Sequence, residues 1–474
     1  GSDGGSNKAS GKSPGEGKAE CAQLTQFGDL TGKKVHVYTT IVAPEDKAQK
    51  DSYKLFTDCT GATVQYEGSK EMEAQILVRA QSGNLPDIAY IPQPGLLNTL
   101  VTQTGTVKEA PKGVADNVDK FWSKDWKGYG TVDGKLYAAP LGANVKSFVW
   151  YSPKMFKDNG WTVPQTWDDL MKLSDQIAAK GIKPWCAGFE SGEATGWPGT
   201  DWLEDMLLRT AGADVYDKWV SHGIPFNDPQ VADALDKVGA ILKNPKYVNG
   251  GIGDVKSIAT TAFQQGGLPI LKGKCAMHRQ ASFYAANWPT GTKVAEDGDV
   301  FAFYLPPVDP SKGKPVLGGG EFVAAFNSNP ATVAFQTYLS SDVWANEKAK
   351  ATPGGGWVSA NKGLDPNNLV SPIDKLSAQI LADPNAVFRF DGSDAMPAAV
   401  GANSFWKQMV AWITGQDTKT TLDNIEKSWP KSLTHLRAAG PAHAGPAALR
   451  PPPAPRRLVP SPRPWEGTCR QARS

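Results

Sequence analysis

The sequence of 474 residues lacks several features that would each point to a particular class of protein. No stretch approaches the ~18 consecutive apolar residues of a membrane-spanning helix. The five cysteines show no C-x-x-C spacing and the five histidines are scattered, so we expect no zinc site. The net charge is only +2, which gives no reason to expect a nucleic-acid or membrane-surface partner. The motifs HExxH and GxxxxGK[ST] are also absent, and no cofactor is expected.

Arginine is scarce until the end of the chain. The first 432 residues contain four arginines, whereas residues 433–474 contain seven and no lysine. The same final segment is crowded with proline and has no periodic apolar pattern. We expect 433–474 to be disordered and non-native, from vector-derived or out-of-frame sequence, which would leave Cys469 as a spare thiol. A genuine Pro/Arg-rich interaction tail is the alternative.

The chain opens with GSDGGSNKASGKSPGEGK, which has almost no apolar residue. Such a composition cannot bury enough surface to offset the entropy of ordering, so residues 1–20 are predicted to form a disordered tether. Bacterial surface lipoproteins carry a similar segment after a lipid-bearing cysteine. Cloning-derived residues before a ragged terminus are the alternative.

Between these segments, strand-like runs alternate with amphipathic helical stretches, which predicts a parallel sheet covered by helices. In chain order, the first part is predicted to form strand 33–40, helix 45–58, strand 62–68, helix 71–81 and strand 86–91. The pattern continues with strand 146–153, helix 166–181 capped by Thr166, helix 200–212 capped by Thr200, strand-like 274–283 and 299–306, strand 318–327 and helix 331–349. Residues 371–429 read as mostly helical.

Four motifs in order give the sequence a family resemblance. They are SGNLPDIAYI (82–91), DGKLYAAPLGANVKSFVWYSPKMF (133–156), NGWTVPQTWDDLMKLSDQIAAKGIKPW (159–185) and KGKCAMHRQASF (272–283). Together they resemble the extracellular solute-binding proteins of ABC importers, the family that includes maltose-binding protein. Ser152-Pro153 stands where the family usually has Asn. The resemblance covers about residues 25–430.

The resemblance implies an α/β fold of the type II periplasmic-binding-protein kind, with a ligand cleft between two lobes joined by hinge crossings. Lobe 1 would comprise 21–145 and 312–360, and lobe 2 would comprise 146–311 and 361–432. The crossings would fall near 144–147, 309–314 and 359–363. Four cysteines of the body allow three pairings. We favour Cys21–Cys59 and Cys186–Cys275 because each pair stays within one lobe; four free thiols are the alternative, and disulfides would indicate an oxidising compartment.

Sugar recognition combines aromatic faces that stack on C–H groups with polar side chains that bond to hydroxyls. Candidate ligand contacts therefore lie in loops, at strand ends or at the crossings, and are Glu71, Gln93, Asn144, Lys146, Trp197, Asp201, Arg279, Trp288, Glu321, Gly355, Trp357, Arg389 and Asp391. For the tryptophans the alternative role is core packing.

Several candidates have a specific alternative. Trp197 is placed in a loop beside a Pro-Gly turn, and Asp201 at a helix start could be a cap instead of a contact. Lys146 could be a solvated charge. Arg279 and Arg389 could each form an Arg–Asp bridge, with Asp391 or Asp394 as the partner of Arg389.

These observations predict a monomeric binding protein, not an enzyme, that captures an α-glucoside or another small di- or oligosaccharide and delivers it to an ABC importer permease. Actinobacterial α-glucoside binders look most similar. We expect it to be extracellular and lipid-anchored, although the anchor cysteine is not in this chain. A glycoside hydrolase using two of Glu71, Asp201 and Glu321, a binder of a non-sugar solute, and a sugar-sensing receptor subunit are the alternatives.

Overall fold

The computed structural model describes residues 8–431. Contacts between Cα atoms divide the chain into two compact units. Unit 1 consists of Gly1–Asn144 and Gly319–Ala378, and unit 2 of Val145–Gly318 and Gln379–Ser474. The first division falls beside the predicted crossing at 144–147. The second and third lie at 318/319 and 378/379, later than the predicted 309–314 and 359–363.

Unit 1 is built on a sheet in which β1 lies between β2 and β3, all parallel. Strand β11 pairs antiparallel with β3, with Phe322 opposite Ile91. The strands of unit 1 are β1 (Lys34–Thr39), β2 (Thr63–Gly68), β3 (Ile88–Ile91), β4 (Thr131–Val132), β5 (Lys135–Leu136) and β6 (Ala138–Val145), with β11 (Lys314–Ala325) entering from unit 2. The parallel order of the first three strands confirms the predicted alternation of strands and helices.

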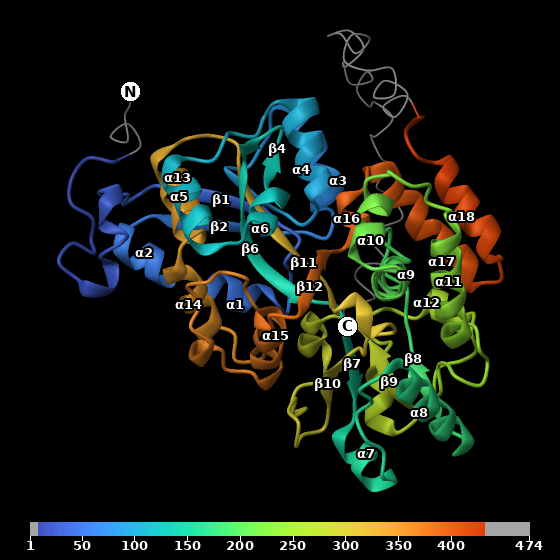
Figure 1. The fold of residues 1–474 in the computed structure, drawn as a ribbon. Helices are drawn as coiled ribbons and strands as arrows, with labels where there is room; N and C mark the ends of the chain where they lie inside the picture. The colour runs from blue at the N-terminus through green and yellow to red at the C-terminus, as the bar shows by residue number, and fades with distance from the viewer. Residues whose placement is uncertain (1–7, 432–474) are drawn as a thin grey trace. The chain divides into compact units, whose positions relative to one another are not determined.

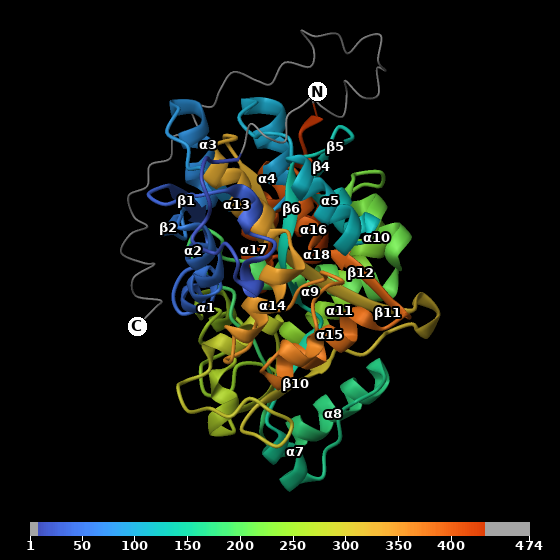
Figure 2. The same cartoon turned by 90° about the vertical axis from the view of Figure 1, so that its left-hand side faces the viewer.

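The helices of unit 1 are α1 (Asp46–Asp51), α2 (Lys54–Thr60), α3 (Met72–Ser82), α4 (Pro94–Thr99), α5 (Lys112–Phe121), α6 (Lys124–Tyr129), α13 (Pro330–Leu339), α14 (Asp342–Lys350) and α15 (Pro372–Ala382), the last crossing into unit 2. Helix α13 lies beside β1 in both Figure 1 and Figure 2. Phe56 and Phe335 meet in the core there, with ring centroids 5.0 Å apart. Burying each such ring contributes roughly 1.5–3 kcal/mol.

Two of the predicted helices of unit 1 are interrupted. The predicted helix 45–58 is two helices, α1 and α2, and 331–349 is α13 and α14. Ser341 explains the second break, because its side chain caps α14 by accepting a hydrogen bond from the Trp344 amide at 3.2 Å.

The prediction of a disordered tether over residues 1–20 is wrong for the described part, residues 8–20. The Ala9 amide donates to the Phe27 carbonyl and the Gly15 amide to the Cys59 carbonyl, each at 3.0 Å. Cys21 and Cys59 form a disulfide beneath this segment, and Ser13 is buried. Backbone pairing and the disulfide therefore order a segment that its composition alone could not. Residues 1–7 and the predicted disordered tail 433–474, with Cys469, lie outside the described residues.

Unit 2 contains a four-stranded sheet in the order β10-β7-β9-β8. Strand β7 is antiparallel to both neighbours, whereas β8 and β9 are parallel. The strands are β7 (Phe148–Tyr151), β8 (Lys183–Cys186), β9 (Cys275–Arg279), β10 (Phe301–Tyr304) and β12 (Ala386–Phe390), which pairs in parallel with the start of β11. The second predicted disulfide, Cys186–Cys275, joins β8 to β9 and is confirmed.

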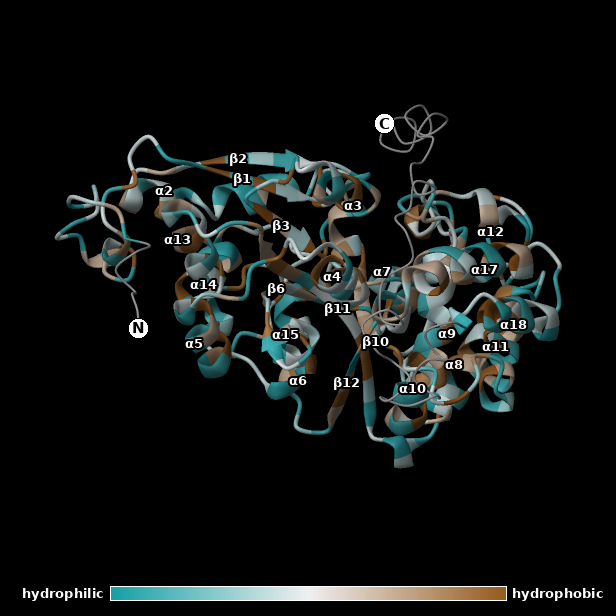
Figure 3. Ribbon diagram, turned by 90° about the horizontal axis from the view of Figure 1, so that it is seen from above, coloured by the Kyte–Doolittle hydropathy of each residue, from teal (hydrophilic) through white to brown (hydrophobic). Residues whose placement is uncertain are grey.

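The helices of unit 2 are α7 (Pro153–Asn159), α8 (Trp167–Ala179), α9 (Trp197–Thr210), α10 (Ala213–Val220), α11 (Pro229–Leu242), α12 (Ser257–Thr260), α16 (Gly392–Ala395), α17 (Phe405–Ile413) and α18 (Thr418–Lys427). Thr166 caps α8 as predicted, since its side chain accepts from the Asp169 amide at 3.1 Å. Helix α11 buries residues spaced by three and four, from Val231 to Leu242, which is the pattern of an amphipathic helix, and both hydrophobic and hydrophilic residues are coloured along it in Figure 3. Within residues 8–431, none of the helices combines the length and apolar character needed to cross a bilayer.

Candidate functional site

Helix α9 is unusual because nearly its whole surface is buried. Residues Pro198 to Arg209 are all buried, and Figure 1 shows the helix beside α10, α11 and α17. The helix begins at Trp197, because Gly196 before it adopts φ +112° and Pro198 needs no amide partner in the first turn. The predicted start at Thr200 is therefore wrong, and Trp197 is the first helical residue instead of a loop residue. Asp201 lies inside the helix and is not its cap.

Lys146 forms the centre of a buried charged cluster at the start of α9. Its Nζ lies 3.0 Å from Asp201 Oδ2 and 2.6 Å from Asp391 Oδ2. The side chain of Asp201 is fully buried, and those of Asp391 and Lys146 are 4% and 9% exposed. The structure thus brings together three predicted site residues that are separated by up to 245 positions in the chain.

Electrostatics within this cluster favour the ionised lysine. Burial alone would lower the pKa of Lys146, but Asp201 and Asp391 outweigh burial and raise it above its ordinary value. Burial likewise opposes ionisation of Asp391, yet the Lys146 ammonium holds the pKa of that carboxyl below its usual range. Lys146 is therefore a fixed cation and not the solvated charge that we considered as its alternative.

An aromatic surface adjoins the ammonium. The Trp197 ring lies 5.0 Å from the Phe263 ring and 5.9 Å from the Phe283 ring, between centroids. Lys146 Nζ is 5.3 Å from the centroid of the Trp197 ring. All three aromatic side chains are only partly buried. A partly exposed aromatic face beside a fixed hydrogen-bond donor is suited to a ligand that has both apolar and hydroxylated surfaces.

Arg279 has a structural partner. Its Nη2 lies 2.7 Å from Asp205 Oδ2, and Asp205 also pairs with Arg209 on the next turn of α9. Although burial would raise the pKa of Asp205, the two guanidinium groups hold it below its ordinary value. Arg279 is 2% exposed and forms the Arg–Asp bridge that we considered as its alternative role; its role as a ligand contact stays a prediction.

Trp288 and Arg389 are also committed to packing and pairing. Trp288 is 7% exposed and packs against Trp150 and Tyr284, in a core and not on an exposed loop. Arg389 Nε donates to Asp217 Oδ1 at 2.8 Å, so an Arg–Asp bridge forms here with Asp217.

Unit 1 holds a second cluster, around Trp357. Asp374 Oδ1 accepts hydrogen bonds from the Gly356 and Trp357 amides at 2.8 and 3.2 Å. Lys348 Nζ lies 4.9 Å from the centroid of the Trp357 ring. Burial raises the pKa of Asp374 to about 7 and lowers that of Lys348 to about 8.

Glycine and glutamate residues fit closely around the same tryptophan. A Cβ at Gly142 would lie 2.5 Å from Trp357 Nε1 and 3.4 Å from Glu321 Oε2, so only glycine leaves room for the indole there. Burial raises the pKa of Glu321, and the Gly142 amide opposes that shift. Gly355 adopts φ +79°, which favours glycine in the turn that leads to Trp357. The structure thus brings together three predicted residues of unit 1: Glu321, Gly355 and Trp357.

The other predicted residues of unit 1 are dispersed. Glu71 precedes α3, where its amide donates to Ser69 Oγ at 3.1 Å. Gln93 precedes α4 and donates to Glu73 Oε2. Asn144 ends the unit, and its Oδ1 is buried without a hydrogen-bond partner. Their roles as ligand contacts stay predictions.

Sequence reasoning missed Phe263, Phe283, Glu204, Lys348 and Asp374. Phe263 lies in none of the four motifs and Phe283 only ends the last of them; segments distant from α9 in the sequence bring both rings to Trp197. A signal for Glu204 was present, since TDWLEDMLLRT places Asp201, Glu204 and Asp205 within one and a half turns of a helix rich in leucine.

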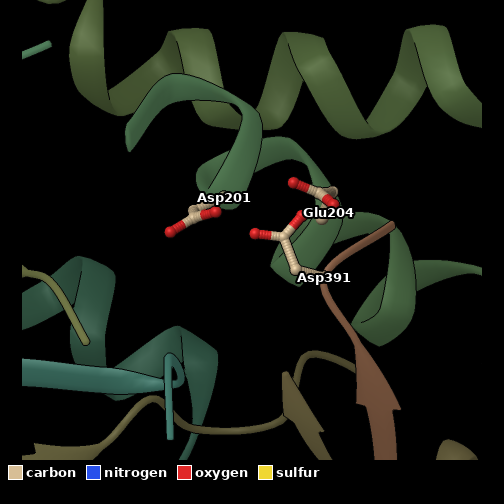
Figure 4. A group of neighbouring side chains, drawn as sticks. All are labelled: Asp201, Glu204 and Asp391. Carbon is tan, nitrogen blue, oxygen red and sulfur yellow. The ribbon is translucent and has the colours of Figure 1, made fainter. Parts of the chain in front are cut away.

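The carboxylates of Asp201, Glu204 and Asp391 could together hold a cation, since their ligand atoms lie within 4.8 Å of one another (Figure 4). Lys146 already places its ammonium between two of them. Elsewhere in unit 2, a cavity of about 550 Å³ is lined by a proline-rich set of residues that shares none with this cluster: Val163, Pro164, Gln165, Tyr304, Pro306, Pro307, Pro310, Gly313, Lys314 and Asn385.

Comparisons with known proteins agree with the fold. Residues 40–370 match the family "Bacterial extracellular solute-binding protein". The osmoprotective compounds-binding protein GgtB of Synechocystis is 37% identical over 407 residues, covering 85% of this chain and 94% of GgtB. The alpha-glucosides-binding periplasmic protein AglE of Rhizobium meliloti is 37% identical over 436 residues, covering 88% and 92%.

Solved structures match over nearly their whole length. The bacterial solute receptor AcbH, described as preferring β-D-galactopyranose, has a TM-score of 0.69 at 19% identity, covering 85% of this chain and 99% of AcbH. Maltose-bound MalE3 of T. maritima has a TM-score of 0.64 at 16% identity, covering 84% and 98%. These matches confirm the predicted two-lobed α/β fold. The chain therefore belongs to the bacterial extracellular solute-binding proteins, the maltose-binding-protein-like family of ABC importers, whose members bind solutes and are not enzymes.

Proposed function

We propose that this protein captures a small carbohydrate of the α-glucoside class and delivers it to the permease of an ABC importer. The observation that carries the proposal is the partly exposed aromatic face of Trp197, Phe263 and Phe283 beside the Lys146 ammonium. The name of the 37% identical AglE supports this ligand class.

The chemistry of a sugar fits both parts of this surface. A pyranose ring has an apolar C–H face that stacks on indole, and its hydroxyl oxygens accept hydrogen bonds from a lysine. Asp201 and Asp391 hold Lys146 in one position, so little side-chain entropy is lost when it binds a hydroxyl. In unit 1, Trp357 and Glu321 offer the same combination of an aromatic face and a polar group.

The name of GgtB favours a second candidate ligand, an osmoprotective compound. Many such compounds carry a quaternary ammonium group, which proteins bind in aromatic cages. Here the Lys146 cation already lies 5.3 Å from the Trp197 ring and would repel a second cation. The aromatic face therefore favours a hydroxylated osmoprotectant over a cationic one.

Calorimetric titration with maltose, trehalose, sucrose and glycine betaine tests the ligand class. We expect binding of at least one α-glucoside, recovery of that sugar unchanged, and no binding of glycine betaine. Betaine binding without sugar binding would refute the proposal, and hydrolysis of the sugar would support the glycoside hydrolase instead.

The Trp197→Ala variant tests the aromatic face. If the sugar stacks on this ring, affinity should fall by roughly 1–3 kcal/mol. Trp161→Ala is the matched control, because Trp161 also lies under a lysine, with Lys180 Nζ 5.6 Å from its ring centroid, but contacts none of the α9 cluster. Equal affinity in the two variants would mean that Trp197 serves only in packing.

We also propose that units 1 and 2 act as the two lobes and change their relative orientation when ligand binds, in a monomer held outside the cell by a lipid anchor. Small-angle scattering with and without sugar should show a decrease in the radius of gyration at the mass of one chain. Fractionation of the native organism should place the protein with the membrane, and its release by lipase digestion would support the anchor.

A further inference from the structure

Helix α9 and its neighbours contain more buried carboxylates than buried cations. The carboxylates are Asp201, Glu204, Asp205 and Asp391, and the cations are Lys146, Arg209 and Arg279, each of these side chains being almost completely inaccessible. A buried charge without a partner is strongly destabilising. One of the four carboxylates must therefore be neutralised in another way.

Three of the four carboxylates have a direct cationic partner, although Asp201 and Asp391 share one ammonium. Asp205 pairs with two arginines, and Asp201 and Asp391 pair with Lys146. Glu204 has no cationic partner among the described ion pairs. Its Oε2 accepts from the Ser393 amide at 2.8 Å, whereas its Oε1 is buried and has no donor partner.

The position of Glu204 indicates how it is neutralised. Asp391 lies between Asp201 and Glu204, and its carboxyl points toward both (Figure 4). A metal ion there would lie close to the Lys146 ammonium, which is 2.6 Å from Asp391 Oδ2 and would repel it. A proton shared between two neighbouring carboxyl groups neutralises the extra charge without that repulsion.

We propose that Glu204 is a neutral carboxylic acid at neutral pH, whose Oε1–H donates to Asp391, and that it is a positioning residue for Lys146. The proton saturates one lone pair of Asp391 while Ser393 Oγ donates to Asp391 Oδ1 at 2.6 Å, and these bonds orient the carboxylate toward Lys146. Glu204 thereby fixes the donor that the proposed function places against a sugar hydroxyl, and this last step rests on that function.

Burial raises the pKa of Glu204 well above its ordinary value, Asp391 and Asp201 raise it further, and Lys146 only partly opposes them. Burial also raises the pKa of Asp201, to about 8, but the Lys146 ammonium 3.0 Å away opposes that shift. The groups that face the cluster are Asp201, Asp205 and Arg209 on α9, Tyr216 on α10, Lys146 after β6, Arg279 on β9, and Asp391 and Asp394 at α16. Asp394 is partly exposed to water and therefore lies outside the buried charge count.

Carboxyl-carbon NMR of the full chain, labelled with ¹³C-glutamate, tests the proton directly. We expect one glutamate resonance to keep the chemical shift of a protonated acid at neutral pH and to be missing in Glu204→Gln. Ionisation of every glutamate at neutral pH would overturn the proposal whether or not any sugar binds.

Two substitutions on one helix form a matched pair. Glu204→Gln keeps a donor for Asp391 and an acceptor for Ser393, so the melting temperature should stay the same. If the wild type binds a sugar, the variant should bind the same sugar with an affinity within about twofold. Asp205→Asn removes a carboxylate from two arginines and should lower the melting temperature markedly. Similar destabilisation by both substitutions would mean that Glu204 is ionised.

The cation alternative and the positioning role are tested separately. The melting temperature should be the same in calcium chloride, magnesium chloride and EDTA, and a rise with either metal would overturn the proton assignment.

Glu204→Ala should weaken sugar binding. The sugar affinity of the wild type should fall from neutral to alkaline pH, whereas the affinity of Glu204→Gln should stay constant. Identical pH profiles for wild type and Glu204→Gln would refute the positioning role.

Discussion

Replacement of Lys146 by methionine tests the charged cluster most severely. Methionine fills a similar volume but removes the cation from two carboxylates that are 0% and 4% exposed. Breaking a buried pair in this way costs roughly 3–5 kcal/mol of the free energy of unfolding. We expect Lys146→Met to fall in this range in urea unfolding at about pH 8, followed by tryptophan fluorescence.

The pH dependence of this loss provides a second criterion. In Lys146→Met, burial without a cation raises the folded-state pKa of Asp201 and Asp391 above the unfolded value of about 3.9. A raised carboxyl pKa contributes stability at low pH that is lost as pH rises, so the variant should recover part of its stability at about pH 5. In the wild type, the raised pKa of Lys146 keeps the lysine charged throughout this range, and the lysine opposes the burial that raises the pKa of Asp201 to about 8.

An exposed lysine pair supplies the control. Lys154 Nζ lies 2.7 Å from Asp158, but the lysine side chain is 80% exposed. Lys154→Met should therefore leave the free energy of unfolding nearly unchanged. A loss in Lys146→Met as small as that of the control, or one that is independent of pH, would refute the view of Lys146 as the partner of buried carboxylates.

Two other features give measurable predictions. Burial lowers the pKa of His278 to about 4. Protonation of this histidine in the unfolded chain should therefore reduce the free energy of unfolding by roughly 3 kcal/mol as the pH falls from about 6.5 to 4. Chemical denaturation of His278→Asn should no longer show this pH dependence, and an unchanged dependence would contradict the prediction. The disulfides Cys186–Cys275 and Cys21–Cys59 span 89 and 38 positions, and loop-closure entropy gives about 4.6 and about 3.9 kcal/mol respectively. Paired serine substitutions should lower the free energy of unfolding in that order, and a larger loss at Cys21–Cys59 would show that chain entropy does not set the ranking.

Local sequence pattern was sufficient for most of the fold. The apolar runs that became β1, β2 and β3 are flanked by turn residues, and α3 follows helical spacing to Gly83. It was insufficient for α9. The pattern WPGTDW predicts a loop followed by a threonine cap, but Gly196 at positive φ lets the helix begin three residues before the predicted start, at Trp197.

The candidate site was also predictable from the sequence only in part. Sequence position near a crossing was enough to select Lys146 and Trp357, and Asp391 was selected as a possible partner of Arg389. It could not show that Arg279 is saturated by Asp205, because that pair joins residues 74 positions apart. Composition also misled at residues 8–20, where backbone hydrogen bonds and a disulfide order a segment with few apolar side chains.

The chain passes between the two units three times, at 144/145, 318/319 and 378/379. No single cut can release either unit whole, and a fragment that ends anywhere before residue 319 lacks part of both. During synthesis, the last segment of unit 1 is made before the last segment of unit 2. Asp391, the partner of Lys146, is made 245 residues after the lysine. An insertion at one passage therefore leaves the two units joined by the other two.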